Sequence, residues 1–145
     1  MSEPAKTRSK RGDFKALVPI TLRWHDNDAY GHVNNVTYYA FFDTAVNQLL
    51  IEGGVLDIEA NTIVGLVIET RCTYFASLTY PGTIEVGVRV AHIGRTSVRY
   101  SLSIFAEGLE DAAAMGEFTH VYVERASQKP TPIPDAVRAL LQSLM

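Results

Sequence analysis

The spacing of apolar residues changes once along this chain, and that change constrains the fold more than any other feature. Between about 36 and 52, apolar side chains recur every three or four residues, which predicts one long amphipathic helix. From residue 62 onward the period is two, as in Val86, Val88 and Val90, which predicts strands with one buried face. One long helix and a run of strands predict an α+β domain in which the helix covers the sheet.

Turn residues give the expected boundaries of these elements. Strands are predicted at 17–24, 62–76, 82–93, 96–107 and 112–124. Gly53-Gly54 ends the long helix, and a short helix is expected at 135–144. Short turns between successive strands indicate consecutive hairpins and therefore an antiparallel sheet of about five strands. The wide apolar stripe predicts that the long helix is buried nearly all round.

Length and charge limit the kind of protein. The 145 residues suit one domain, and a net charge of −3 argues against nucleic-acid binding. No apolar run approaches the ~20 residues that span a bilayer, so membrane insertion is not expected. Cys72 is the only cysteine, which excludes an intrachain disulfide and fits the reducing cytoplasm. Residues 1–15 carry a net charge of +3 and are expected to form a flexible basic tail before a single domain at 16–145.

The segment from Asp26 to Tyr38 contains the residues that point to chemistry. Asp28 and Gly31 lie shortly before the predicted helix, whose first backbone N–H groups have no partner within the helix. An anion or a polarised carbonyl is stabilised at such a helix start. Asp28 therefore is either a catalytic acid or a simple turn residue, and Asp26, two residues earlier, is expected to have a structural role.

Several motifs, taken in order, resemble one known family. They are Arg23-Trp24 with Asp26-Asn27-Asp28, Gly31-His32-Val33-Asn34-Asn35 with Tyr38, Phe41-Phe42-Asp43, Tyr80-Pro81-Gly82-Thr83, Ile93-Gly94-Arg95-Thr96-Ser97 and Pro132-Ile133-Pro134. Over about residues 17–135 the chain resembles the hotdog-fold acyl-CoA thioesterases of the 4-hydroxybenzoyl-CoA thioesterase-like group. The resemblance implies a sheet wrapped round the central helix. It also implies a homodimer with a continuous sheet and active sites at its interface, and makes a tetramer plausible.

The resemblance also implies roles for individual residues. Asp28 would act as nucleophile or general base, Gly31 would form the turn, and the backbone N–H of Asn35 would polarise the carbonyl. Substrate-binding residues are expected at His32, Asn34, Tyr38, Arg95, Thr96 and Ser97, the last three near the pantetheine arm and phosphates of CoA unless they form a plain turn. Asp43 is an alternative acid, although the arginine that often follows it in the family is absent here.

The reaction expected from the resemblance is hydrolysis of an acyl-CoA to a free acid and CoA. A thiol has a pKa of roughly 8.5, so it can leave as thiolate without a general acid. No cofactor is expected, and one cysteine with four scattered histidines argues against a zinc site. Two alternatives stay open, namely a non-catalytic protein that binds acyl-CoA or acyl carrier protein, and an acyl-carrier-protein thioesterase.

Overall fold

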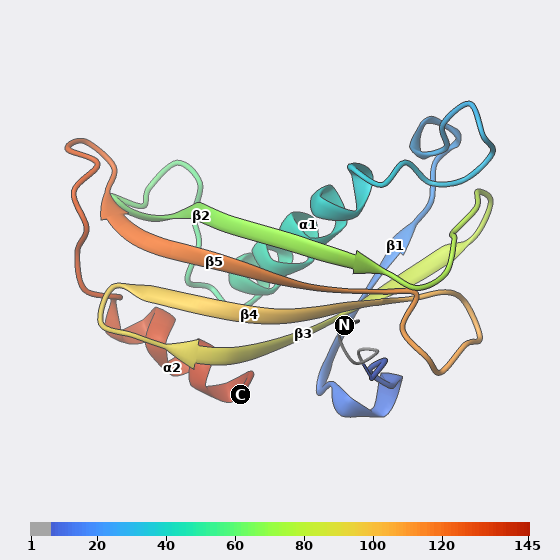
Figure 1. The fold of residues 1–145 in the computed structure, drawn as a ribbon. Coiled ribbons are helices and arrows are strands. Elements are labelled where there is room, and N and C mark those ends of the chain that lie inside the picture. Colours follow the sequence, from blue (N-terminus) through green and yellow to red (C-terminus); the bar gives the residue numbers. More distant parts are fainter. Residues whose placement is uncertain (1–6) are drawn as a thin grey trace, which may run out of the picture.

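A curved five-stranded antiparallel sheet wraps round one long helix in the computed structural model, which describes residues 7–145 (Figure 1). The strands are β1 (Ala16–Thr21), β2 (Ile63–Tyr74), β3 (Thr83–Ile93), β4 (Ser97–Phe105) and β5 (Ala114–Glu124), and the helices are α1 (Thr37–Glu52) and α2 (Asp135–Ser143). Short 3-10 turns lie at Arg11–Asp13 and Trp24–Asp26. The predicted α+β class and sheet are confirmed, with boundaries within three residues of those expected.

The strand order is β1-β3-β4-β5-β2, so β1 and β2 form the two edges. β3–β4 and β4–β5 are hairpins, but β2 pairs with β5 and β3 pairs with β1. The expectation that all successive strands form hairpins is therefore wrong for β2 and β3. The physical reason is α1, which carries the chain from one edge of the sheet to the other. The connection after β2 must then cross back, and it brings Leu78 beside the loop that precedes α1.

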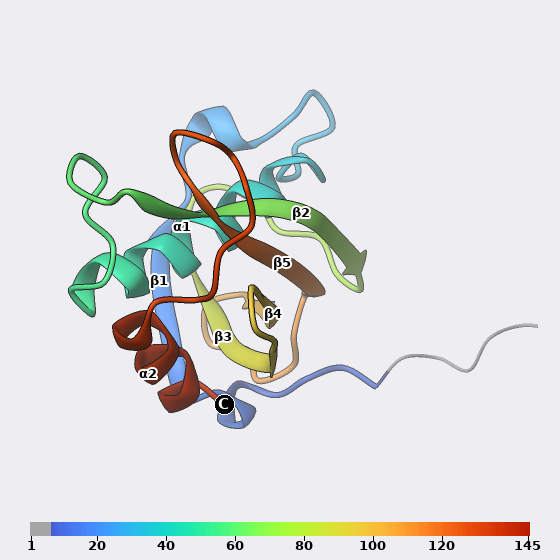
Figure 2. The ribbon, with the colours of Figure 1, turned by 90° about the vertical axis from the view of Figure 1, so that its left-hand side faces the viewer.

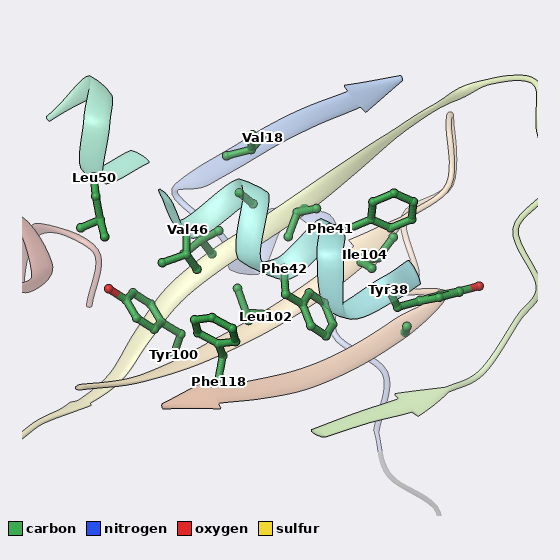
Figure 3. Packing of buried hydrophobic residues seen from close by; sticks show 14 of the residues in the cluster. Val18, Tyr38, Phe41, Phe42, Val46, Leu50, Tyr100, Leu102, Ile104 and Phe118 are labelled. Carbon is green, nitrogen blue, oxygen red and sulfur yellow. The ribbon is translucent and has the colours of Figure 1, made fainter. Parts of the chain in front are cut away.

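One side of α1 fills the concave face of the sheet (Figure 3). Its buried side chains, which pack against β3, β4 and β5, are Tyr38, Phe41, Phe42, Ala45, Val46 and Leu50. The opposite side, with Ala40, Asp43 and Thr44, is exposed. Within one protomer the prediction of a helix buried nearly all round is therefore wrong, because five strands curve round only one side of it.

Phe42 packs directly on Gly116 of β5, and this contact gives a stability prediction. A β-carbon at Gly116 would lie 2.5 Å from the Arg71 carbonyl oxygen and 2.5 Å from Cε2 of Phe42. Overpacking of this kind typically costs about 1–3 kcal/mol, so Gly116→Ala is expected to lower the free energy of unfolding by that amount in urea titrations. Gly12→Ala is the control, because a β-carbon there meets no described atom within 4 Å. Unchanged stability of Gly116→Ala would contradict the packing described.

α2 lies on the same side of the sheet as α1 and protects the far end of β3 (Figure 2). Val137 and Leu141 of α2 join the core. β1 pairs with β3 only as far as Val88, and beyond it the N–H of Val90 donates to the carbonyl of Leu144 at 2.9 Å. Since an edge strand with unpaired groups can recruit another strand, this contact blocks pairing at the β3 side. β2 is the long edge left uncovered among the described residues.

The predicted basic tail lies partly outside the described residues, which exclude residues 1–6. In the described part, the Arg11 guanidinium pairs with Glu85, and the Phe14 ring is buried against Phe105 with centroids 5.8 Å apart. The domain boundary at residue 16 stays a prediction.

Candidate active site

The segment between β1 and α1 folds into a tight loop closed by the Asn27–Val33 bridge. The Asp28 N–H donates to the His32 carbonyl at 2.9 Å, and the Gly31 N–H donates to the Asp28 carbonyl at 3.1 Å. Gly31 has φ +81°, a conformation that favours glycine, which agrees with the predicted turn. The loop is tied to the β2–β3 connection because the Val33 N–H donates to the Leu78 carbonyl at 2.8 Å.

The carboxylate of Asp28 is half-buried on this loop. Its Oδ1 accepts the backbone N–H of Tyr30 at 2.8 Å, an Asx turn that orients the side chain. None of the residues between 7 and 145 donates a hydrogen bond to the other oxygen. One oxygen therefore holds the side chain in place while the second is available to attack a carbonyl or to accept a proton.

Asp26 has the structural role that was expected of it. Its side chain is buried, accepts the Arg23 N–H at 2.8 Å and forms an ion pair with the Arg23 guanidinium at 2.9 Å. Burial acts to raise the pKa of Asp26, but the hydrogen bonds and charge of Arg23 outweigh it and hold that pKa below its ordinary value. The carboxylate is thus ionised and fully engaged, which leaves Asp28 as the acid available in this loop.

The N–H of Asn35, just before α1, is unpaired among the described residues. Asn34 Oδ1 accepts the N–H of Val36 at 2.9 Å, and the Asn34 carbonyl accepts the N–H of Thr37 at 2.9 Å. Asn34 therefore supports the helix start with both its side chain and its backbone carbonyl. Among the described residues nothing accepts the N–H of Asn35. A fixed N–H at a helix start is suited to stabilise negative charge on a carbonyl oxygen.

Tyr74, at the end of β2, holds the carbonyl of the same residue, Asn35, in the peptide that follows this N–H. Its hydroxyl donates to the Asn35 carbonyl at 2.6 Å, and its ring packs edge-to-face on Tyr38 with centroids 4.8 Å apart. Burial raises the pKa of both phenols, so each remains a neutral hydroxyl at physiological pH. Sequence reasoning missed Tyr74, because its place beside Asn35 depends on how β2 crosses the helix.

A cavity of about 310 Å³ lies beside this helix start. It is lined by Val33, Asn35, Tyr38, Tyr74, Phe75, Ala76 and Ser77. Asp28 and His32 are not among the lining residues, and His32 is exposed on the loop. One protomer therefore brings the Asn35 N–H, Tyr38 and Tyr74 together at a cavity, with Asp28 on the adjoining loop.

The alternative acid, Asp43, lies on α1 about two turns beyond Asn35. It is exposed, because it lies on the side of α1 that the sheet does not reach. Its Oδ1 accepts the Asn47 amide at 3.0 Å. Asp43 is not part of the lining of the 310 Å³ cavity.

The predicted CoA-binding residues Arg95, Thr96 and Ser97 lie at the other end of the sheet. They follow Ile93, the last residue of β3, whereas the chain leaves β1 for the Asp28 loop at Thr21, which pairs with the first residue of β3. Ten residues of strand span about 33 Å. One protomer does not bring this turn together with Asp28. Arg138 holds the turn by donating to the Gly94 carbonyl at 2.8 Å.

A second polar position that sequence reasoning missed is His120, on β5. Its side chain is buried, its Nδ1 has no partner in the part of the chain that the structure describes, and it borders a cavity of about 60 Å³. Burial lowers the pKa of His120 to about 4, so the imidazole is neutral at physiological pH. No motif marks it in the sequence, because a histidine at an inward strand position is not distinctive.

The depressed pKa of His120 predicts a loss of stability in acid. Unfolding restores an ordinary pKa near 6.5, so the unfolded state binds more protons between that pH and about 4. The full contribution is present above pH 6.5 and is expected to fall by about 3 kcal/mol as the pH approaches 4. Urea unfolding at pH 7 and pH 4.5 measures it. His120→Leu should lose less stability than the wild type over this interval, and an equal loss would contradict the burial described.

Comparison with known protein families assigns the class. The family model for the thioesterase-like superfamily matches residues 22–141. The chain therefore belongs to the thioesterase-like superfamily, and it is a thioester hydrolase with the hotdog fold. No curated protein sequence matches the chain significantly. Within residues 7–145, no helix is long and apolar enough to cross a membrane, and no group of three side chains could hold a metal ion.

Solved structures agree with this fold. The PA5185 protein from Pseudomonas aeruginosa strain PAO1 is 52% identical, with a TM-score of 0.94 over 96% of this chain and 97% of that one. A structure described as a predicted thioesterase from Bacillus stearothermophilus is 25% identical, with a TM-score of 0.76 over 90% and 97% of the two chains. The 1,4-dihydroxy-2-naphthoyl-CoA thioesterase Slr0204 from Synechocystis is 14% identical, with a TM-score of 0.80 over 88% and 96%. This last likeness concerns the fold alone.

Proposed function

We propose that this protein hydrolyses acyl-CoA thioesters with Asp28 and the backbone N–H of Asn35. The observation that carries the proposal is the unpaired Asn35 N–H, held at the helix start beside a 310 Å³ cavity. Asp28, with one oxygen free, precedes it by seven residues on the same loop. Two solved structures with a similar fold are also described as CoA thioesterases, one for 1,4-dihydroxy-2-naphthoyl-CoA and one for gentisyl-coenzyme A.

In this mechanism the thioester carbonyl oxygen accepts a hydrogen bond from the Asn35 N–H. Asp28 then either attacks the carbonyl carbon itself or takes a proton from a water that attacks it. Negative charge develops on the carbonyl oxygen, where the Asn35 N–H stabilises it. The C–S bond breaks and CoA leaves as thiolate. In the nucleophilic route, water next hydrolyses the anhydride between Asp28 and the acyl group.

A single turnover in H₂¹⁸O distinguishes the two routes. Direct attack by Asp28 forms an anhydride, and water that attacks its aspartyl carbonyl leaves ¹⁸O in the protein and an oxygen of the aspartate in the acid product, so ¹⁸O in Asp28 identifies this route. Attack by water places ¹⁸O in the acid at once. Mass spectrometry of the product and of the peptide that contains Asp28 identifies the route.

We propose further that β2 pairs with β2 of a second copy. β2 is a long uncovered edge, and it exposes the apolar side chains of Leu66, Val67 and Ile68. Antiparallel pairing about a twofold axis would set the start of β2 beside the end of the partner's β2. The end of the sheet that carries Arg95 would then approach the partner's Asp28 loop, where a guanidinium could bind the phosphates of CoA. Pairing of dimers into a tetramer stays a prediction.

Tyr74 is predicted to act as a positioning residue for Asn35. Tyr74→Phe removes the hydroxyl that donates to the Asn35 carbonyl at 2.6 Å and keeps the ring packed on Tyr38. We expect kcat to fall about tenfold with KM unchanged, because the backbone of Asn35, whose N–H lies next to the anchored carbonyl, is less firmly oriented. Tyr30→Phe is the control, since the Tyr30 side chain is exposed on the same loop. A rise in KM with normal kcat would show that Tyr74 binds substrate instead.

Thiol-release assays with acyl-CoA and with acyl carrier protein loaded with the same acyl group test the carrier. The proposal predicts a higher kcat/KM for acyl-CoA. Turnover of only the acyl carrier protein would support the acyl-carrier-protein thioesterase. Tight binding of acyl-CoA without thiol release would support the non-catalytic binding protein.

A further inference from the structure

The inner face of β2 is only partly covered by α1. Residues that pair across an antiparallel sheet share a face, so the partners of the inward residues of β5 also point inward. On β2 these partners include Gly65, Val67, Thr70 and Tyr74. Val67 is 46% exposed and Thr70 is exposed as well, which shows that α1 leaves the middle of this face uncovered.

Two cavities lie at the two ends of this uncovered stretch. One is the 310 Å³ cavity at Asn35 and Tyr74, and the other is the 60 Å³ cavity beside Gly65, Asn47 and His120. From Asn35, just before α1, to Asn47 the chain advances twelve residues, about 18 Å of helix. Figure 3 shows Tyr38 at one end of the core and Leu50 and Tyr100 at the other.

The small cavity borders an unsatisfied polar atom. His120 is 3% exposed, and its Nδ1 has no partner among residues 7–145. Leaving a buried polar atom unpaired is destabilising, and such atoms ordinarily have a partner, often a water or a ligand. Gly65 leaves room for the imidazole, since a β-carbon there would lie 3.0 Å from Nδ1.

The lining also defines the charge of the group that fits. The lining residues other than His120 are Asn47, Leu50, Val55, Leu56, Asn61, Ile63, Val64, Gly65 and Tyr122, and none of them carries a charge. The imidazole is neutral at physiological pH because burial lowers its pKa to about 4. A neutral group that donates or accepts a hydrogen bond matches this lining, whereas an ammonium or carboxylate would lack a counter-charge.

We propose that the acyl group of the substrate lies along the inner face of β2 and that its distal end carries a neutral hydroxyl or carbonyl group that hydrogen-bonds to His120 Nδ1. The inference rests on the proposed function and specifies its substrate class. A cavity of about 60 Å³ takes only a few heavy atoms, since a water occupies about 30 Å³ of liquid volume. The site therefore selects acyl chains by a polar end group.

Pairs of acyl-CoAs of equal chain length, with and without a terminal hydroxyl, test this proposal in thiol-release assays. At the chain length that reaches the cavity, the wild type is expected to show a kcat/KM about tenfold higher for the hydroxylated member. His120→Leu should bring the ratio to about one while hydrolysis of the unsubstituted member continues. His92→Leu, at an exposed histidine on β3, should keep the wild-type ratio.

Two results would overturn the proposal: a wild-type ratio of about one at every chain length, or an unchanged ratio in His120→Leu. If that variant does not fold, Gly65→Ala is used instead, because its β-carbon displaces the imidazole and should also lower the ratio. Failure of the wild type to hydrolyse any acyl-CoA would instead contradict the proposed function, so the two failures are distinguishable.

Discussion

Asp28→Asn is expected to lower kcat by two or more orders of magnitude with little change in KM. The amide keeps the size of the side chain and can still accept the Tyr30 N–H, which holds the loop. It cannot attack a thioester as a carboxylate does, and it is too weak a base to activate water. Steady-state thiol release from one acyl-CoA measures both constants.

Two other carboxylates serve as controls for Asp28→Asn. Asp43→Asn is expected to retain near-normal turnover, because Asp43 is exposed and lies away from the cavity at Asn35. Asp26→Asn should instead lower stability, because it removes the charge of a buried carboxylate that pairs with Arg23. Normal turnover by folded Asp28→Asn would contradict the assignment, and a large loss in Asp43→Asn would point to the helix carboxylate.

Charges on the β2 edge are expected to separate the dimer and to abolish most activity. Leu66→Lys with Ile68→Lys places two ammonium groups on the exposed edge, where Ile68 is 63% exposed. Lysine on an edge strand opposes the addition of another strand. We expect the mass from light scattering to halve and kcat/KM to fall at least tenfold. The reason is that the end of the sheet that carries Arg95 no longer approaches the Asp28 loop of the second copy, where it could bind the CoA phosphates.

Leu109→Lys is the matched control for the edge variant. Leu109 is 57% exposed in the loop between β4 and β5, so the same change of residue type occurs away from β2. It should retain the wild-type mass and activity. A wild-type protein that is a monomer at assay concentration and fully active would contradict an active site completed by a partner.

The segment around Asp28 was predictable because its signals are local. The acid, Gly31 and the helix start lie within a dozen residues, and the helix period and the turn chemistry are both readable there. The Asn34 side chain accepts the N–H of Val36, only two residues along the chain, so this contact is also a local one. The paired Asp26 was expected to be structural on the same grounds.

The remaining site residues depend on contacts between distant parts of the chain. Tyr74 meets Asn35 only because β2 pairs with β5 rather than with β3, and the hairpin signals in the sequence favoured the other arrangement. The cavity at His120 depends on the same pairing, which sets Gly65 against the imidazole. The resemblance assigns Arg95 and Asp28 to one substrate site, yet within one protomer they lie at opposite ends of β3.

The most direct test of the account is thiol release by the wild-type protein over a panel of short, long and aromatic acyl-CoAs, with the acid product identified by mass spectrometry. If the protein hydrolyses acyl-CoA as proposed, it will convert at least one substrate into free acid and CoA with catalytic turnover. The same substrate should be hydrolysed at least 100-fold more slowly by Asp28→Asn. The absence of turnover by the folded wild type on every acyl-CoA of the panel would contradict the proposed function.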